Sequence, residues 1–366
     1  MKSHKLLLFL LAGALLGQTL PTQGSPFNSL PHMIIGGEAI LDYITTRIKM
    51  VAQNAPEIST IKNKSLPRYT FDPELMQYEP ALQKYLKDFA LRHHNLENVT
   101  FLPGPNRFGY AMTSANEIKI PSDDYAYLLC RMHPEYKEID AAEYLKECNT
   151  DEKIDVLKAN SALKDCSTII KVRCSNGTSI QKYAASNKMD SIESSLHHEL
   201  GHIKHKSFSK KNYCNIASAI SLSTLSLTVA PPAKTSFALQ CATGCAVLGA
   251  RYLIALLYAK YDETRADDTI PNDARLLKAK EKDYRNSFNR QLDAIRKSSS
   301  NELPWYQRPF AHLLPHSYWE KYPHLTEFLY LTDDHPSDYF RAERFKARLA
   351  ALENNNKPLK EISNEK

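Results

Sequence analysis

The chain has 366 residues, of which 43% are hydrophobic and 24% are charged, so it is long enough for one large domain or two modest ones and lacks the composition of a disordered protein. Its 11 glycines and 20 prolines follow no fixed period, which excludes a collagen-like architecture. The net charge is only +6, and we find one short cluster of lysines, at 204–211. Nucleic-acid-binding proteins usually carry a larger basic patch, so we expect no nucleic-acid partner.

The first 24 residues have the pattern of a secretory signal peptide. Lys2 and Lys5 precede an apolar run over residues 6–16, and small and polar residues follow up to Gly24. This run is shorter than the ~20 residues that span a bilayer, and an uncleaved membrane anchor is the alternative interpretation. We therefore expect an exported protein, periplasmic or secreted, in which an N-terminal segment at 25–74 follows the signal.

Periodicity divides the next part of the chain into a helix, a strand, an insertion and a second helix. Apolar residues at three-to-four spacing predict a helix over residues 80–95, and alternation of residue types predicts a strand over 110–120 with one face exposed. The polar, cysteine-bearing stretch at about 131–186 is interpreted as an insertion. The second helix is expected to begin near Asp190 and to run through Ile203.

Two apolar segments predict a helical hairpin over residues 213–259. Pro231 and Pro232 separate the segments, and Gln240 and Arg251 make insertion of the hairpin into a membrane costly. We therefore expect it to pack on the rest of the protein or to lie against a membrane surface as a peripheral contact. The remaining predicted elements are two polar helices and a flexible tail: residues 273–297, 337–352 and 353–366.

Four of the seven cysteines cluster in or beside the insertion: Cys130, Cys148, Cys166 and Cys174. Because export places a protein in an oxidising compartment, we predict two disulfide bonds among them, and three pairings are open. No two cysteines have the C-x-x-C spacing of a zinc ribbon.

The residues that carry chemistry lie in one helical segment, His197-His198-Glu199-Leu200-Gly201-His202. On a helix, His198 and His202 share a face, so both imidazoles can reach one zinc ion. Glu199 lies beside them, where it can take a proton from a metal-activated water, as in the H-E-x-x-H zinc peptidases. The alternative is a solvated helix face with incidental histidines, and His197 is expected to contact a neighbour or solvent rather than the metal.

Two histidines leave a catalytic zinc ion short of a third ligand, and Glu263 follows the apolar hairpin in Tyr261-Asp-Glu-Thr-Arg-Ala-Asp267. The histidine motif, followed by an apolar hairpin and Glu263-x-x-Ala-Asp267, resembles the HtpX and CAAX prenyl-endopeptidase family of zinc metallopeptidases, family forty-eight. The segment His335-Pro-Ser-x-x-x-x-x-Glu-Arg344 resembles the closing signature of that family. The resemblance covers residues 75–130 and 186–352.

The resemblance implies a mainly helical α+β fold of the gluzincin type at 75–352, with a small edge-strand sheet. It implies one zinc ion per chain, held by His198, His202 and Glu263. It further implies that Asp267 orients a ligand histidine, that Arg344 supports the ligands and that His335 stabilises the oxyanion of the reaction. The residues implied for a substrate-binding edge strand are Ala115, Asn116, Ile118 and Ile120.

We therefore predict a zinc-dependent endopeptidase that acts on protein or peptide substrates. Glu199 is expected to deprotonate the attacking water and then to protonate the leaving amine. The alternative is a catalytically inactive relic that acts as a binding or chaperone-like protein in the cell envelope. Glu199 argues against a relic, because a purely structural zinc ion needs a fourth protein ligand rather than a base.

Overall fold

The computed structural model describes residues 71–106, 110–163, 166–207, 237–296, 316–330 and 335–355, with a few positions between 209 and 218. The predicted signal, nearly all of the N-terminal segment and nearly all of the first arm of the hairpin lie outside these residues. The chain divides into two compact units, Met1–Ser65 with Ser209–Ala259 and Leu66–Phe208 with Lys260–Lys366. Every residue predicted to take part in chemistry belongs to the second unit.

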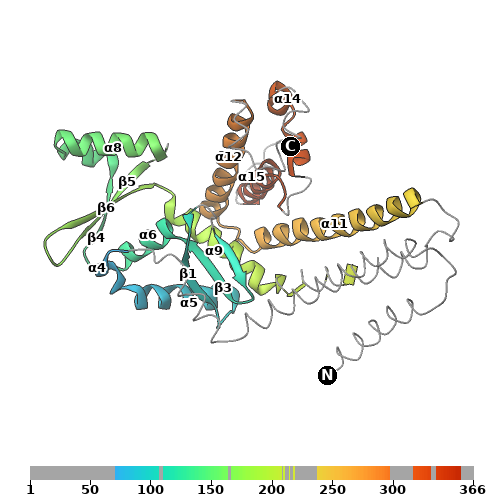
Figure 1. The fold of residues 1–366 in the computed structure, drawn as a ribbon. Coiled ribbons are helices and arrows are strands. Elements are labelled where there is room, and N and C mark those ends of the chain that lie inside the picture. The colour runs from blue at the N-terminus through green and yellow to red at the C-terminus, as the bar shows by residue number, and fades with distance from the viewer. Residues whose placement is uncertain are drawn as a thin grey trace, which may run out of the picture. The chain divides into compact units, whose positions relative to one another are not determined.

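The described residues form mostly helices, together with two small sheets, which confirms the mainly helical α+β class (Figure 1). The first sheet has the strands β1 (Thr100–Gly104), β2 (Ala111–Ser114) and β3 (Glu117–Pro121). β3 pairs in parallel with β1 and antiparallel with β2, so β2 is an edge strand. The helices that pack around this sheet are α5 (Glu79–His94), α6 (Ser122–Met132) and α9 (Lys188–Lys204).

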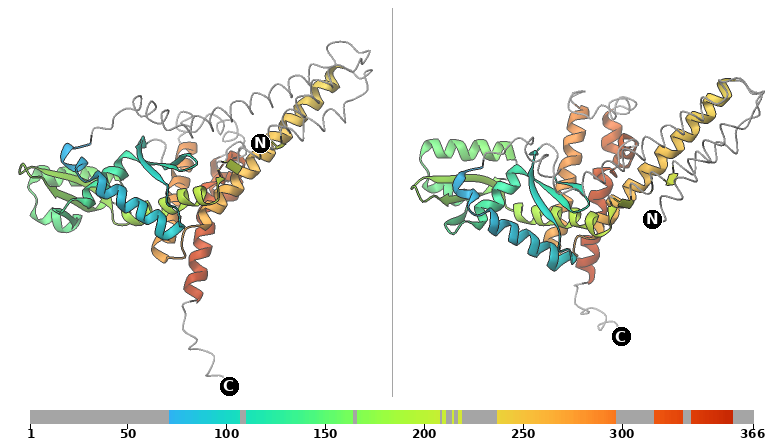
Figure 2. Two further views of the ribbon diagram at one scale, coloured as in Figure 1. Left: turned by 90° about the horizontal axis from the view of Figure 1, so that it is seen from below. Right: turned by 60° about the horizontal axis from the view of Figure 1, so that its bottom comes forward.

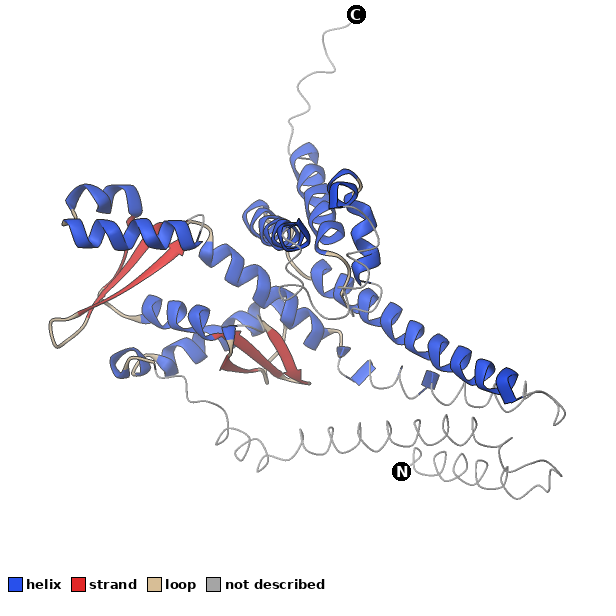
Figure 3. Ribbon diagram, turned by 45° about the horizontal axis from the view of Figure 1, so that its top comes forward, coloured by secondary structure: helices blue, strands red, loops and turns tan. Residues whose placement is uncertain are grey.

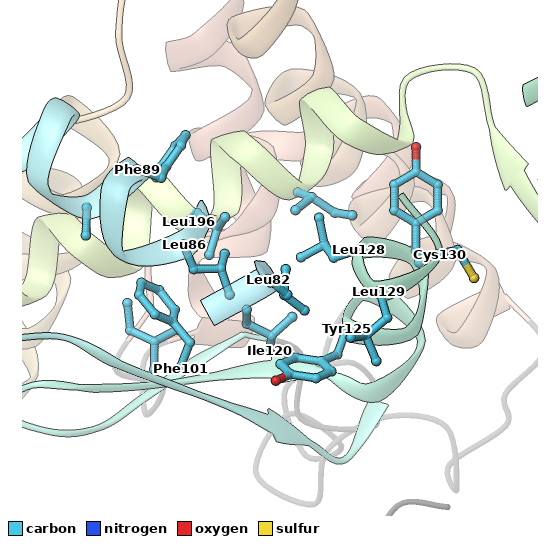
Figure 4. Close-up of a cluster of buried hydrophobic side chains, with 14 of the residues drawn as sticks. Leu82, Leu86, Phe89, Phe101, Ile120, Tyr125, Leu128, Leu129, Cys130 and Leu196 are labelled. Carbon is cyan, nitrogen blue, oxygen red and sulfur yellow. The ribbon is translucent and has the colours of Figure 1, made fainter. Parts of the chain in front are cut away.

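The main hydrophobic core lies between these helices and the first sheet (Figure 4). Leu82 and Leu86 of α5 are four residues apart and therefore share the buried face, where they meet Leu196 of α9. Each fully buried leucine contributes roughly 1.5–3 kcal/mol. Asn95 ends α5 in the left-handed conformation, with φ 56° and its backbone N–H bonded to Leu91.

The strand predicted over residues 110–120 is a hairpin of two strands. Ala115 and Asn116 form the turn between β2 and β3. Ile118 and Ile120 lie in the central strand with no exposed surface, so they belong to the core. The prediction that these four residues form a substrate-binding edge is therefore wrong, and β2 is the edge strand. The sequence did not reveal the turn, because apolar and polar residues alternate with the same period of two in both strands.

The predicted insertion folds as a second sheet with two helices against it, and Figure 3 shows the strands in two separate groups. Its strands are β4 (Tyr136–Asp140), β5 (Cys166–Arg173) and β6 (Ser179–Ala185), antiparallel in that order. Its helices are α7 (Ala141–Glu147) and α8 (Thr150–Leu163). Asp140 begins α7 by accepting hydrogen bonds from the N–H groups of Ala142 and Glu143.

The four clustered cysteines are free thiols: Cys130, Cys148, Cys166 and Cys174. The two predicted disulfide bonds are therefore not formed in the structure. Cys130 on α6, Cys166 at the start of β5 and Cys174 directly after β5 are instead buried as small apolar side chains. Burial raises the pKa of the Cys130 thiol to about 11.

The remaining elements are helical: α4 (Pro73–Met76), α11 (Phe237–Asp268), α12 (Ala274–Arg296), α14 (His316–Lys321), the 3-10 helix η3 (Pro323–Tyr330) and α15 (Asp338–Asn355). α12 packs against both α15 and α9 (Figure 2). α11 continues nine residues past the predicted end of the hairpin at Ala259, and α15 takes in the first residues of the predicted tail. None of the described helices is long and apolar enough to cross a membrane.

Candidate metal centre

His198 and His202 lie one turn apart on the buried face of α9. Their Nε2 atoms are 3.3 Å apart, and 7% and 8% of their side chains are exposed. Glu199 is the next residue after His198 and is also buried, with its Oε1 atom 4.0 Å from His198 Nε2. The helix thus presents two imidazoles and a carboxylate at one place, as the sequence spacing predicts.

Glu263 on α11 faces both histidines. Its Oε2 atom lies 3.3 Å from His198 Nε2, and its Oε1 atom lies 3.3 Å from His202 Nε2. One ligand atom from each of the three residues lies within 4.8 Å of the others. The structure therefore brings together the three side chains that the sequence predicts as metal ligands.

Two further carboxylates fix the orientation of the imidazoles. Asp267 Oδ1 lies 2.9 Å from His198 Nδ1, and Asp262 Oδ2 lies 3.1 Å from His202 Nδ1. Because an ionised carboxylate only accepts hydrogen bonds, His202 Nδ1 carries the proton and donates it to Asp262, whereas the Asp267 carboxylate lies at ion-pair distance from His198 Nδ1. Asp267 lies beside a histidine of the motif, which is the position that the family resemblance implies. Asp262 was not predicted, although its position next to Glu263 was a signal for it.

The Nε2 atom of neutral His202 and a carboxylate oxygen of Glu263 face each other with their lone pairs. In its neutral form, with Nδ1 protonated, His202 has an acceptor at Nε2, and Glu263 Oε2 is a buried oxygen with no hydrogen-bond partner among the described residues. Zinc ligands at about 2.0–2.1 Å from the ion in tetrahedral geometry lie about 3.3–3.4 Å apart. The two Nε2 atoms are 3.3 Å apart, which fits that geometry, and each of them has a different Glu263 oxygen at 3.3 Å.

The charges around the histidines also fit a divalent cation. Four buried or nearly buried carboxylates gather there: Glu199, Asp262, Glu263 and Asp267. The buried cations among the described residues are Lys280 and Arg341. The carboxylates thus outnumber the buried cations by two, and buried charges are stable only when they are paired or bind a metal.

The pKa values of these groups reflect the same excess of negative charge. Burial lowers the pKa of His202, but its hydrogen bonds to Asp262 and Glu263 outweigh burial and raise that pKa to about 10. Burial raises the pKa of Asp267, yet the charge of Arg341 and the bond to His198 hold it far below its usual value. Without a metal, the site therefore attracts a proton, the smallest cation available.

Arg341, rather than the predicted Arg344, contacts the carboxylates of Asp267 and Glu263. Arg341 donates hydrogen bonds of 2.9 and 2.8 Å to Asp267, and its Nη1 atom lies 3.5 Å from Glu263 Oε2. The Tyr284 hydroxyl group donates a hydrogen bond of 3.2 Å to Asp267, and the Tyr284 ring lies against the Arg341 guanidinium. Arg344 instead bonds the Thr264 carbonyl oxygen and pairs with Asp268. The assignment of Arg344 was therefore wrong by one helical turn.

His335 lies at the edge of this group. Its Nε2 atom is 3.6 Å from Glu263 Oε1, and 49% of its side chain is exposed. It is near enough to the ligands to contact a molecule bound there, and it is open to solvent on the other side.

His197 points away from the other histidines of the motif. Its Nδ1 atom lies 2.8 Å from His94 Nε2 of α5, and its ring packs against Phe89. Burial lowers the pKa of His197 to about 3 and that of His94 to about 4, so both rings are neutral at pH 7. His197 thus ties α9 to α5, in agreement with its exclusion from the predicted ligands.

Comparison with models of protein families, with curated proteins and with solved structures finds no match to this chain.

Proposed function

We propose that this chain is a zinc-dependent endopeptidase that hydrolyses peptide bonds in proteins. The observation that carries the proposal is that His198, His202 and Glu263 each place a ligand atom within 4.8 Å of the other two, with Glu199 beside them. Three protein ligands leave one position open, which is typical of a catalytic rather than a structural zinc site.

The donor set favours zinc over other common cations. Two imidazole nitrogens and one carboxylate match zinc, whereas calcium and magnesium are held by oxygen ligands alone. A zinc ion at this site supplies a Lewis acid that lowers the pKa of water and polarises a carbonyl group.

The residues of the chain then divide the remaining tasks. Glu199 accepts the proton of the attacking water and later delivers it to the leaving amine. His335 donates a hydrogen bond to the carbonyl oxygen as negative charge develops there. β2 binds the substrate backbone, because an edge strand that packs against α9 can take an extended peptide as a further strand.

The direct experiment measures zinc and hydrolysis in the same samples. Purified protein should contain one zinc ion per chain by elemental analysis and should cleave casein or quenched fluorescent peptides. Glu199→Gln should keep the zinc and lose hydrolysis by several orders of magnitude, because the ligands remain and the base is removed. Glu193→Gln, the same change on the same helix outside the site, should leave both measurements unchanged.

A protein that holds zinc but cleaves none of these substrates would favour the alternative, a binding protein with a relic site. Equal hydrolysis by the wild type and Glu199→Gln would remove Glu199 from the mechanism.

A further inference from the structure

Asp262 bridges a ligand histidine and a serine from the segment after α9. Its Oδ2 atom lies 3.1 Å from His202 Nδ1, and its Oδ1 atom accepts a hydrogen bond of 2.7 Å from the Ser207 hydroxyl group. The same hydroxyl oxygen is 3.4 Å from His202 Nδ1. Asp262 and Ser207 are 6% and 3% exposed, so solvent does not compete for these bonds.

A backbone turn places Ser207 in this position. α9 ends at Lys204, where the backbone N–H of His205 bonds to the Gly201 carbonyl oxygen. Lys206 then adopts φ 55°, the left-handed conformation that residues other than glycine rarely take. This turn directs Ser207 back toward the last turn of the helix. Unfavourable backbone conformations of this kind persist where the surrounding structure requires them.

The two carboxylates that hold the histidines differ in how their charge is compensated. Asp267 is paired with the Arg341 guanidinium through two hydrogen bonds and also receives the Tyr284 hydroxyl group. Asp262 contacts a neutral hydroxyl group and the imidazole. More of its negative charge therefore acts on the imidazole, because no lysine or arginine among the described residues pairs with Asp262.

We propose that Asp262, held by Ser207, is the positioning residue that fixes the Nδ1-protonated tautomer of His202 and strengthens its Nε2 atom as a metal ligand. Carboxylates behind zinc-bound histidines act in this way, and their loss typically weakens metal binding by about 10–100-fold. The inference deepens the proposed function and rests on it, since it assumes that His202 binds a metal ion.

The test measures metal binding without any assay of hydrolysis. Zinc affinity is obtained by competition with a chromophoric chelator, and the absorption spectrum of the Co2+-loaded protein reports the ligand field. Asp262→Ala should lower zinc affinity by about 10–100-fold and change the Co2+ spectrum. Asp262→Asn keeps the acceptor oxygen but removes the charge, so it should cause a smaller loss, of about tenfold or less.

Variants of the other members separate positioning from folding. Ser207→Ala should weaken zinc binding by a few-fold, and Ser207→Thr, which keeps the hydroxyl group, should restore it. Lys206→Gly suits the left-handed turn and should leave zinc affinity unchanged. Asp268→Asn, the same substitution at an exposed acid of α11, should also leave zinc affinity and the Co2+ spectrum unchanged.

Thermal unfolding of the metal-free variants completes the design. A merely structural role for Asp262 would lower the unfolding temperature of Asp262→Asn without altering the Co2+ spectrum or zinc affinity, and that result would overturn the inference. Wild-type protein that binds zinc no better than Asp262→Ala would overturn it as well. If the wild type binds no zinc at all, the proposed function fails first, so the two failures are distinguishable.

Discussion

Gly201 and Thr269 approach each other so closely that a methyl group on Gly201 would overlap the Thr269 hydroxyl oxygen and lie 2.9 Å from its methyl carbon. Thr269 is not free to turn aside, because its hydroxyl oxygen lies 2.8 and 2.7 Å from the carbonyl oxygens of His197 and Ala266. Gly201 stands just before His202 on α9, and Thr269 directly follows α11. Their contact therefore sets how closely Glu263 approaches the histidines.

Gly201→Ala should accordingly damage the site although alanine is the better helix former. We expect a loss of roughly 1–3 kcal/mol in the free energy of unfolding, measured in urea, and weaker zinc binding as α11 is displaced. Adding Thr269→Ala removes the two nearest atoms and should restore part of both. No recovery in the double variant would mean that the Ala266 carbonyl oxygen, 3.1 Å away, is the limiting contact.

Arg341 and Arg344 offer a second comparison. Arg341→Met leaves the carboxylate of Asp267 buried without its cation, and breaking a buried pair in this way typically costs about 3–5 kcal/mol. Arg344→Met removes a pair with Asp268, an acid that is 54% exposed, together with the hydrogen bond to the Thr264 carbonyl oxygen, so its cost should be smaller, about 1–2 kcal/mol. Urea unfolding of the metal-free proteins measures both values.

The double variant Arg341→Met with Asp267→Asn is the control for the buried pair. Removing the uncompensated charge should recover a large part of the stability lost in Arg341→Met. Equal costs for Arg341→Met and Arg344→Met would show that the pair with Asp267 is not the main interaction of Arg341.

The contact between His94 and His197 predicts acid sensitivity. Burial, with the charge of Lys204 as a smaller cause, lowers the pKa of His94 to about 4, against about 6.5 in the unfolded chain. Between these values the unfolded chain binds a proton that the folded chain does not, so stability is complete above pH 6.5 and falls as the pH drops toward 4. For His94 alone the expected loss is on the order of 3 kcal/mol.

Urea unfolding at several pH values between 7 and 4.5 measures this loss. His94→Gln, which retains a hydrogen-bonding side chain without a group that titrates in this range, should give a shallower dependence on pH. The neighbouring titratable groups His93, His197 and His205 remain in that variant. An unchanged slope would assign the acid sensitivity to them instead.

The sequence predicted the parts of the site that depend on local spacing. His198, Glu199 and His202 take their relative positions from one helix, so their arrangement follows from the period of the helix alone. The prediction of Glu263 as a ligand depended on the resemblance to a family with the same order of motifs. The sequence distance between two helices does not show whether they contact each other.

The errors concern relations that depend on the packing of whole elements. Arg341 and Arg344 lie on neighbouring turns of α15, and which of them reaches Asp267 depends on the rotation of that helix against α11. Similarly, residues 110–120 alternate in both arms of a hairpin, so the turn at Ala115 and Asn116 has no separate signal in the pattern. The boundaries of α5 were predicted within one residue because Pro80 and Asn95 mark its ends, whereas α11 has no such signal at the predicted end of the hairpin and continues to Asp268.

The identity of the third ligand is the last relation to test, since Glu263 and His335 lie beside each other, with Glu263 Oε1 and His335 Nε2 3.6 Å apart. Glu263 faces both histidines and is largely buried, whereas about half of the His335 side chain is exposed. Glu263→Ala should therefore lower zinc affinity and hydrolysis together. The loss should exceed the range of about 10–100-fold that is typical of a residue that only orients a ligand. His335→Ala should keep its zinc and lose only turnover. X-ray absorption at the zinc edge should find two nitrogen ligands and oxygen in the wild type. Three nitrogen ligands, unchanged in Glu263→Ala, would assign the third position to a histidine and would contradict the proposed ligand set.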